Sequence, residues 1–290
     1  MDVIIHYYST ETYCKIIQRH FIIPLKLLNA VDFASNHTAF HSVTYNSIVR
    51  YKQIGQMRLN KQTETNKTAW EYHAYEFWQK RDGTPAGKAK EILKDPRASL
   101  KKHQEFFHDV DGLNVANLCG SNGRKAVPLS LMGANVTIFD VSEENRRYAL
   151  ELATCAQTSI DYVVGDVHDL DVSKYEGRFD LLYLEGGILH YFDDLKRLCN
   201  ILYSILKPGK PWFGVIIILS KDASVLSLHM CSSILITSYM KRISHLNPFF
   251  DEDEQQDFPD VLLTHHALSD IINSVITTAF RIRRFDEHRG

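Results

Sequence analysis

The stretch NVANLCGSNGRKA, from Asn114 to Ala126, decides how the rest of the chain is organised. It opens with a short apolar run that is typical of a buried strand. It then passes Gly120 and Gly123 and continues into residues that suit a helix. A strand, a tight glycine turn and a helix N-terminus together favour a pocket for a polar ligand group, because glycine lets the backbone approach the ligand and the first N–H groups of the helix face it.

The composition is that of an ordinary globular protein. The chain has 290 residues, of which 44% are hydrophobic and 23% charged, with a formal net charge of -2. This charge balance gives no reason to expect a nucleic-acid partner. The five cysteines are scattered without a CxxC pair, which argues against a disulfide framework and against a metal site such as zinc. A reduced, cytoplasmic compartment is therefore expected.

Residues 1–61 differ from the rest because basic side chains outnumber acidic ones there. We expect an N-terminal extension that is poorly ordered. An organellar transit peptide is the alternative. A signal peptide is not expected, because no basic start is followed by an apolar core and a small-residue cleavage site.

Residues 62–112 are predicted to form a helical cap. Aromatic side chains at helix-like spacing occur over 66–82, and further helices are predicted over 86–94 and 97–108. These helices either only cover a sheet or form a lid over the pocket.

From residue 113 onward, strands and helices alternate. Strands are expected over 113–118, 135–139, 160–164, 179–184 and 212–219, with helices over 123–132, 143–156 and 193–206, and a last helix and strand over 268–276 and 280–285. Such units imply a parallel sheet covered on both sides, whose ligand lies beyond the carboxyl ends of the strands. The polar turns at 119–123, 140, 166 and 185–187 all fall on that edge.

Residues 220–247 fit this alternation less well. The stretch 223–240 has no charged side chain, but its many hydroxyls favour a helix packed on the sheet over a membrane span. No membrane partner is therefore expected.

The acids on this edge favour an adenosine-containing cofactor. Asp140 follows a strand 20 residues after Gly120, where it can accept hydrogen bonds from both ribose hydroxyls. Asp166 follows the next strand and can bond the adenine amino group. The turn lacks the first glycine of the GxGxxG dinucleotide fingerprint, so S-adenosylmethionine is favoured over a nicotinamide cofactor. A nicotinamide oxidoreductase is kept as a further, less favoured hypothesis.

Several of these segments together resemble the class I S-adenosylmethionine-dependent methyltransferases: Asn117 to Gly123, Asp140, Gly165 to Leu170, Asp180 to Tyr191 and Leu206 to Gly209. The resemblance covers about residues 113–219. It implies an α/β fold with a doubly wound, mostly parallel seven-stranded sheet, the Rossmann-like methyltransferase fold, over residues 113–290 with an atypical insert at 220–247. More narrowly, Asn117 to Ala126 and Phe249 to Glu254 resemble an uncharacterised bacterial and plant subgroup.

The resemblance also implies which residues bind the cofactor. The turn would hold the methionine part, Asp140 the ribose and Asp166 the adenine, with Glu185 to Gly187 near the sulfonium. The implied cofactor-binding residues are Asn117, Cys119, Gly120, Ser121, Asn122, Gly123, Asp140, Val141, Asp166, Val167, Glu185 and Gly186. The chain departs from the family pattern by having Asn117 in place of an acid, and Cys119 and Ser121 in place of glycines.

Methyl transfer needs no obligatory acid–base residue, because aligning the nucleophile with an already activated methyl group can contribute about 7–11 kcal/mol. His190 and Tyr191 are the catalytic candidates, since either could deprotonate or orient an acceptor. For His190 the alternative is a helix-start residue bonded to backbone. We expect a methyltransferase acting on an unidentified small-molecule acceptor. The alternative, suggested by the departures in the turn, is a catalytically impaired S-adenosylmethionine-binding or scaffold protein.

Overall fold

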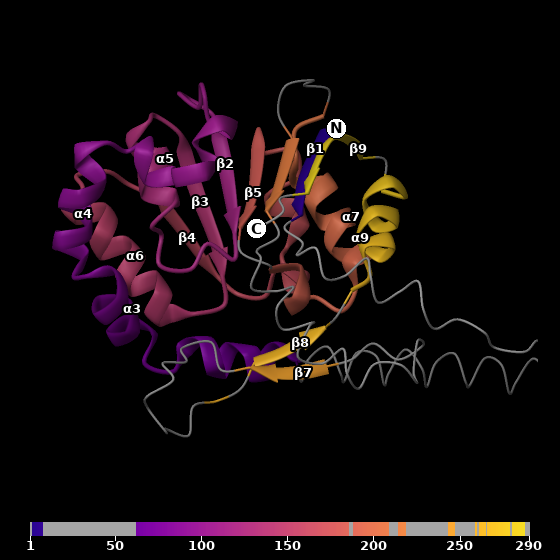
Figure 1. The fold of residues 1–290 in the computed structure, drawn as a ribbon, viewed down its shortest axis with the longest axis horizontal. Coiled ribbons are helices and arrows are strands. Elements are labelled where there is room, and N and C mark those ends of the chain that lie inside the picture. The colour runs from indigo at the N-terminus through magenta and orange to yellow at the C-terminus, as the bar shows by residue number, and fades with distance from the viewer. Residues whose placement is uncertain are drawn as a thin grey trace, which may run out of the picture.

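The computed structural model describes residues 2–7, 62–185, 188–208, 214–218, 243–246, 259, 261–264, 266–278 and 280–287. Their centre is a seven-stranded sheet with the strand order β4-β3-β2-β5-β6-β1-β9 (Figure 1). Every described pairing in it is parallel. The strands are β1 (Asp2–Tyr7), β2 (Asn114–Leu118), β3 (Asn135–Asp140), β4 (Asp161–Val164), β5 (Leu181–Glu185), β6 (Gly214–Ile218) and β9 (Arg281–Glu287).

Helices cover both faces of this sheet, as the alternating sequence pattern predicted. Strands β2, β3 and β5 are buried along almost their whole length, which explains their continuous apolar runs. Successive side chains of a strand point to opposite faces, so Val115 joins one core cluster and Ala116 the other. The first cluster includes α5 (Ala126–Leu131) and α6 (Glu143–Cys155), and the second includes α7 (Leu195–Ile205) and α9 (Leu268–Ile276).

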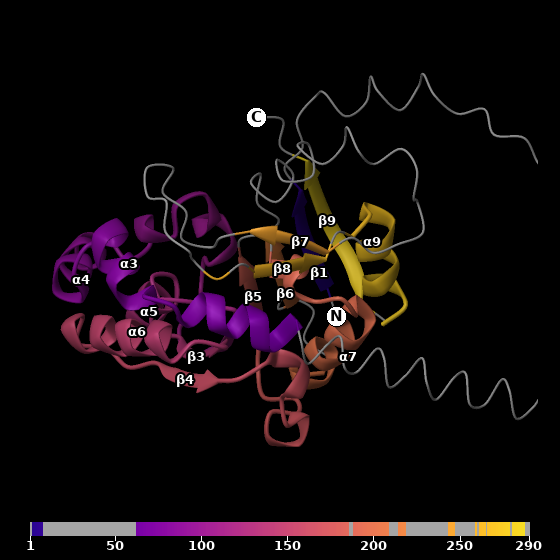
Figure 2. The ribbon, with the colours of Figure 1, turned by 90° about the horizontal axis from the view of Figure 1, so that it is seen from below.

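The cap consists of a helix over residues 62–71, then α3 (Ala74–Asp82), α4 (Pro85–Lys94) and the 3-10 helix η1 (Ala98–Phe106). The single helix expected over 66–82 is therefore wrong in one respect. It is interrupted before α3, where His73 adopts a left-handed backbone conformation with φ of 51°. The helix over 62–71 lies below the carboxyl ends of the strands in Figure 1, and Figure 2 shows it crossing the sheet from that side.

Two parts of the described chain were not foreseen. Residues 2–7, expected in an extension outside the sheet, form β1 between β6 and β9. Residues 243–246 and 261–264, for which no strand was expected, form β7 (Ile243–Leu246) and β8 (Val261–Thr264), which pair antiparallel. The remainder of the predicted extension, most of the stretch 220–247, and the segment Phe249 to Glu254 lie outside the described residues.

None of the helices that the structure describes has the length and apolar character needed to cross a bilayer.

Candidate active site

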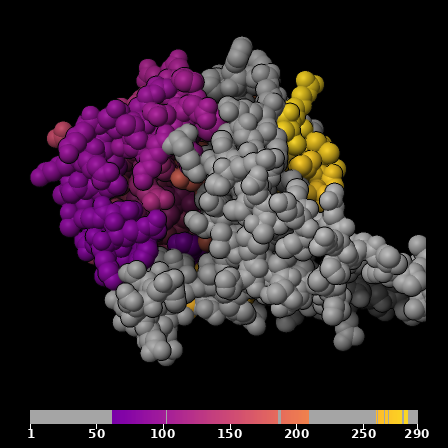
Figure 3. Space-filling model, viewed as in Figure 1, coloured from indigo at the N-terminus to yellow at the C-terminus, as the bar shows by residue number. Residues whose placement is uncertain are grey.

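A cavity of about 520 Å³ opens beyond the carboxyl ends of the central strands. Its floor comes from the loops after β2, β3, β4 and β5, and the helix over 62–71 contributes Thr63, Asn66 and Trp70 to its wall. Figure 3 shows the surface hollowed beside the cap. The cavity is therefore where the parallel topology predicted it, and it is roofed by elements that are far away in sequence.

The turn after β2 is built on backbone conformations that few side chains adopt easily. Cys119 and Ser121 have φ of 50° and 49°, in the left-handed region that glycine occupies without strain. A side chain at Gly120 would place its Cβ 2.6 Å from Asn117 Oδ1, so this position requires glycine. The two departures from the family pattern thus lie at positions that favour glycine, and each non-glycine residue there costs about 1–2 kcal/mol.

Asp140, at the end of β3, is nearly fully buried in the floor of the cavity. Its carboxylate accepts hydrogen bonds from the backbone N–H groups of Ser121 at 3.0 Å and Ser142 at 3.1 Å, and from Asn145 Nδ2 at 3.2 Å. Burial raises the pKa of this carboxyl group, and these donors partly offset the rise. Asp140 therefore both ties the turn to the start of α6 and presents an acceptor to the cavity.

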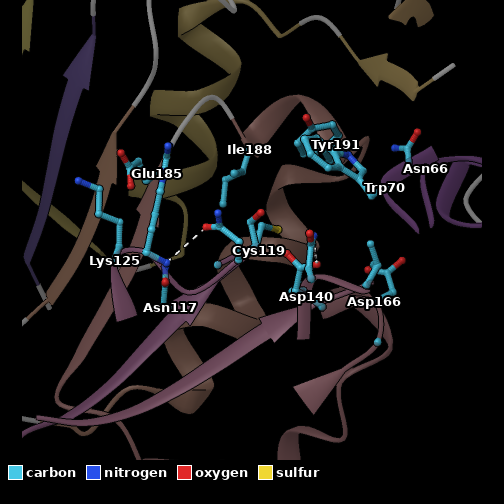
Figure 4. A pocket seen from close by; sticks show the side chains of 18 of the residues that line it. Asn66, Trp70, Asn117, Cys119, Lys125, Asp140, Asp166, Glu185, Ile188 and Tyr191 are labelled. Atoms are coloured by element: carbon cyan, nitrogen blue, oxygen red, sulfur yellow. Dashed lines mark hydrogen bonds between the residues drawn. The ribbon is translucent and has the colours of Figure 1, made fainter. Parts of the chain in front are cut away.

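Asp166, just after β4, marks one end of the cavity (Figure 4). One carboxylate oxygen accepts the backbone N–H of His168 at 2.8 Å, at the start of the 3-10 helix η2 (Val167–Asp169). The other accepts the hydroxyl of Thr63, from the helix over 62–71. This second contact joins the cap to the floor at the position expected for adenine.

The opposite end of the cavity is formed by Asn117, Lys125 and Glu185 (Figure 4). Asn117 is 2% exposed; its Nδ2 donates to the carbonyl of Tyr183 at 3.2 Å, while its Oδ1 has no hydrogen-bond partner. The turn passes close to this unsatisfied acceptor at Gly120, where an added Cβ would lie 2.6 Å from it. Such buried acceptors normally have a donor, so a ligand that brings one would be stabilised here.

Lys125 supplies a buried positive charge at this end. Its Nζ donates to the carbonyls of Ser99 and Leu100, both at 3.2 Å. Burial lowers the pKa of its ammonium group, and the negative charge of Glu185 partly opposes this. A second cavity of about 420 Å³ adjoins here, sharing Arg81, Arg124, Lys125 and Glu185 with the first.

The two catalytic candidates occupy different surroundings. Tyr191, in the 3-10 helix η4 (Ile188–Tyr191), lines the cavity and meets Trp70 edge-to-face at 5.9 Å. Burial raises the pKa of its phenol well above the ordinary value, so at neutral pH it is a hydrogen-bond donor and not a base. His190 is not among the lining residues: its Nδ1 lies 2.9 Å from the carbonyl oxygen of Thr264 in β8. This contact fits the alternative of a residue bonded to backbone, and the catalytic role of His190 stays a prediction.

Most of the predicted cofactor residues meet around one cavity: Asn117, Cys119, Gly120, Ser121, Asn122, Asp140, Val141, Asp166, Val167 and Glu185. Gly123 is not in the lining, because its close approach is to Ala149 of α6, 2.8 Å from where a Cβ would stand. Gly186 lies outside the described residues. The sequence did not single out Thr63 or Lys125 as residues of the site, although Lys125 belongs to the stretch from Asn114 to Ala126. Trp70 and Trp78, which also line the cavity, belong to the aromatic pattern over 66–82.

Comparison with known proteins agrees with this geometry. Residues 115–209 match the family model described as "Methyltransferase domain", a span that contains every predicted cofactor-binding position. This segment is therefore similar to a methyltransferase domain. No curated protein matches the sequence, and nothing supports or opposes the narrower subgroup.

Solved structures of low similarity also match the chain. An S-adenosylmethionine-dependent methyltransferase of Mesorhizobium loti is 21% identical, with 62% of this chain and 80% of that chain covered and a TM-score of 0.41. A Pyrococcus horikoshii protein is 17% identical, with 66% and 81% covered and a TM-score of 0.45. The chain spans only 54% and 46% of the length of two other solved structures that it matches.

Proposed function

We propose that the protein is an S-adenosylmethionine-dependent methyltransferase acting on a small-molecule acceptor. The observation that carries this proposal is the distribution of charge along the cavity. One end has two carboxylates, Asp140 and Asp166, and the other combines the acceptors Asn117 and Glu185 with the ammonium of Lys125. A nucleoside joined to an amino acid has the complementary pattern.

At the nucleoside end, Asp140 would accept the ribose hydroxyls and Asp166 the adenine amino group. Each carboxylate oxygen can accept more than one hydrogen bond, so the protein donors already bound to Asp140 leave room for a ligand. The hydroxyl of Thr63 occupies the oxygen of Asp166 that the ligand would also use. Binding there exchanges one hydrogen bond for another.

At the amino-acid end, the unsatisfied Oδ1 of Asn117 and the carboxylate of Glu185 would accept hydrogen bonds from an α-ammonium group. The carboxylate of the ligand would pair with the cations shared by the two cavities, with Lys125 the most buried of them. A charge-assisted hydrogen bond of this kind contributes about 1.5–3 kcal/mol.

When bound, S-adenosylmethionine supplies an activated methyl group, and the protein needs to hold the acceptor beside it. Trp70, Ile188 and Tyr191 line the cavity with apolar and aromatic surface, and the protonated hydroxyl of Tyr191 can orient a polar acceptor group. The cavity volume falls within the range of about 300–1,000 Å³ usual for small-molecule sites. The cofactor itself would fill most of this volume, so the proposal of a small acceptor rests on the aromatic and apolar wall beside it.

Calorimetry with S-adenosylmethionine, run beside NAD as a control, tests the cofactor. We expect heat from the first ligand only, and its loss when Asp140 and Asp166 are both changed to alanine. Absence of binding at millimolar S-adenosylmethionine would contradict the proposal. Transfer of a labelled methyl group to a panel of small acceptors then tests the reaction.

A catalytically impaired binding protein is the second candidate. It is favoured by the strained Cys119 and Ser121 in the turn and by the Thr63 hydroxyl on Asp166. This candidate predicts cofactor binding without methyl transfer to any member of the acceptor panel.

A further inference from the structure

The carboxylate of Glu185 is held by a buried chain of hydrogen bonds that connects the sheet to the cap. Tyr183 Oη donates to Glu185 Oε2 at 3.0 Å. His103 Nδ1, from η1, lies 2.8 Å from Tyr183 Oη and 3.5 Å from Glu185 Oε1. Tyr183 is fully buried and His103 is 4% exposed, so bulk water does not compete with these contacts.

The direction of each hydrogen bond follows from the number of protons available. A tyrosine hydroxyl has one proton, and Tyr183 gives it to Glu185. The Nδ1 atom of His103 must therefore carry the proton that is donated to the hydroxyl oxygen. Burial raises the pKa of Tyr183 well above its ordinary value, so the hydroxyl keeps its proton over the whole physiological range. Phe107 packs edge-to-face on the same ring at 5.0 Å and restricts its rotation.

Tyr183 also orients the second acceptor at this end of the cavity. Its backbone carbonyl accepts the Nδ2 group of Asn117 at 3.2 Å. This contact fixes the amide so that Oδ1, the atom without a partner, is the one left for a ligand. One residue of β5 thus controls both Asn117 and Glu185, through its main chain and its side chain respectively.

We propose that Tyr183 and His103 are positioning residues that hold the Glu185 carboxylate ready for the α-ammonium group of S-adenosylmethionine. The inference rests on the proposed function, because it requires an amino-acid-bearing nucleoside in the cavity. Tyr183 is not itself a lining residue and would act only through Glu185 and Asn117.

The test compares two ligands that share a nucleoside. S-adenosylhomocysteine has the α-ammonium group, whereas 5′-methylthioadenosine lacks the amino acid. With Tyr183→Phe, we expect the affinity for S-adenosylhomocysteine to fall about tenfold, the loss typical of one hydrogen bond to a charged group. The affinity for 5′-methylthioadenosine should be unchanged. His103→Gln, which keeps a side-chain N–H donor, should show a smaller loss with the same selectivity.

Tyr148→Phe is the matched control. Tyr148 is a fully buried tyrosine of the same core cluster, and its hydroxyl donates to the carbonyl of Gly83 at 2.6 Å. Neither ligand should bind differently to this variant. If Tyr183→Phe does not fold, Glu185→Gln provides the same selective loss directly at the cavity.

Three results would overturn the inference. Equal weakening of both ligands by Tyr183→Phe would show a structural role only, and unchanged binding of S-adenosylhomocysteine would show no role. If Tyr183→Phe does not fold, equal or absent effects of Glu185→Gln on the two ligands would do the same. A wild-type protein that binds neither ligand contradicts the proposed function itself, whereas the other outcomes leave that function intact.

Discussion

The two ends of the cavity are held in place by different kinds of contact. At the nucleoside end, Asp140 and Asp166 each accept the backbone N–H of the residue two positions further along the chain, and Asp166 also accepts the hydroxyl of Thr63 from the cap. At the amino-acid end, Lys125 is bonded to carbonyls of η1, and the chain that holds Glu185 reaches His103, also in η1. The carboxylates of the first end are therefore positioned by local contacts at the ends of the strands, with one added bond from the cap, while the charged groups of the second end depend on η1 for their positions.

Of the substitutions considered, removing the carboxylate of Asp140 should cause the largest loss of ligand affinity. Asp140→Ala takes two ribose acceptors from the ligand and leaves the N–H groups of Ser121 and Ser142 without their bonds. We expect the affinity for S-adenosylhomocysteine and for 5′-methylthioadenosine to fall together by about 100-fold, from about 3 kcal/mol of lost hydrogen bonding. Calorimetry of both ligands measures this. A loss confined to S-adenosylhomocysteine would place the nucleoside elsewhere.

Lys125→Met should affect only the other end. Methionine keeps the apolar length of the side chain but not its charge, so binding of S-adenosylhomocysteine should weaken about tenfold while 5′-methylthioadenosine is unaffected. Lys90→Met, at an exposed position of α4, is the control and should change neither.

The pH dependence sharpens this second prediction. Burial lowers the pKa of Lys125, so the wild-type ammonium loses its proton at a lower pH than an ordinary lysine. As pH rises through that lowered value, wild-type affinity should approach that of Lys125→Met, because both then lack the charge. Titrating both proteins at each pH cancels the ionisation of the ligand. A constant ratio of affinities across the alkaline range would mean that Lys125 does not meet the ligand.

Thr63→Val should have a smaller effect of opposite sign. Valine matches the shape of threonine without its hydroxyl, so Asp166 would no longer be occupied by the cap. We expect both ligands to bind several-fold more tightly, in keeping with about 0.5–1.5 kcal/mol for a hydrogen bond that no longer competes. Tighter binding of only one ligand, or weaker binding of both, would count against adenine at this carboxylate.

Cys119→Gly should produce the smallest change, in the turn between the two ends. The left-handed conformation at φ of 50° costs a cysteine about 1–2 kcal/mol, but glycine loses about 0.5–1 kcal/mol more backbone entropy on folding. The net gain in the free energy of unfolding should be about 1 kcal/mol or less, measured by denaturant titration. As a control, Val115→Gly, at an extended residue of β2, should destabilise the protein.

The comparison also shows how far the sequence could predict the site. The glycine turn and the acids at positions 140 and 166 each come just after a predicted strand. The hydrophobic pattern of the strands and the spacing of these residues were therefore enough to place them on one edge of the sheet. The interruption at His73 has no such signal, because a left-handed residue at that point depends on how the cap packs. The roles of Lys125 and Tyr183 depend on contacts with η1, some 25 and 80 residues away. The contact between His190 and the carbonyl of Thr264 could not be predicted, because Thr264 belongs to a hairpin that the sequence did not indicate.

The position of β1 gives residues 2–7 a part in closing the sheet. They pair on one side with β6 and on the other with β9, so the first and last strands of the described chain are hydrogen-bonded neighbours. Contacts of this range form slowly, because a very long loop must close first. A protease that cut between residues 7 and 62 would leave β1 held in the sheet only by its pairing with β6 and β9. Cleavage there after folding would therefore remove the covalent link to an interior strand and not simply shorten a tail.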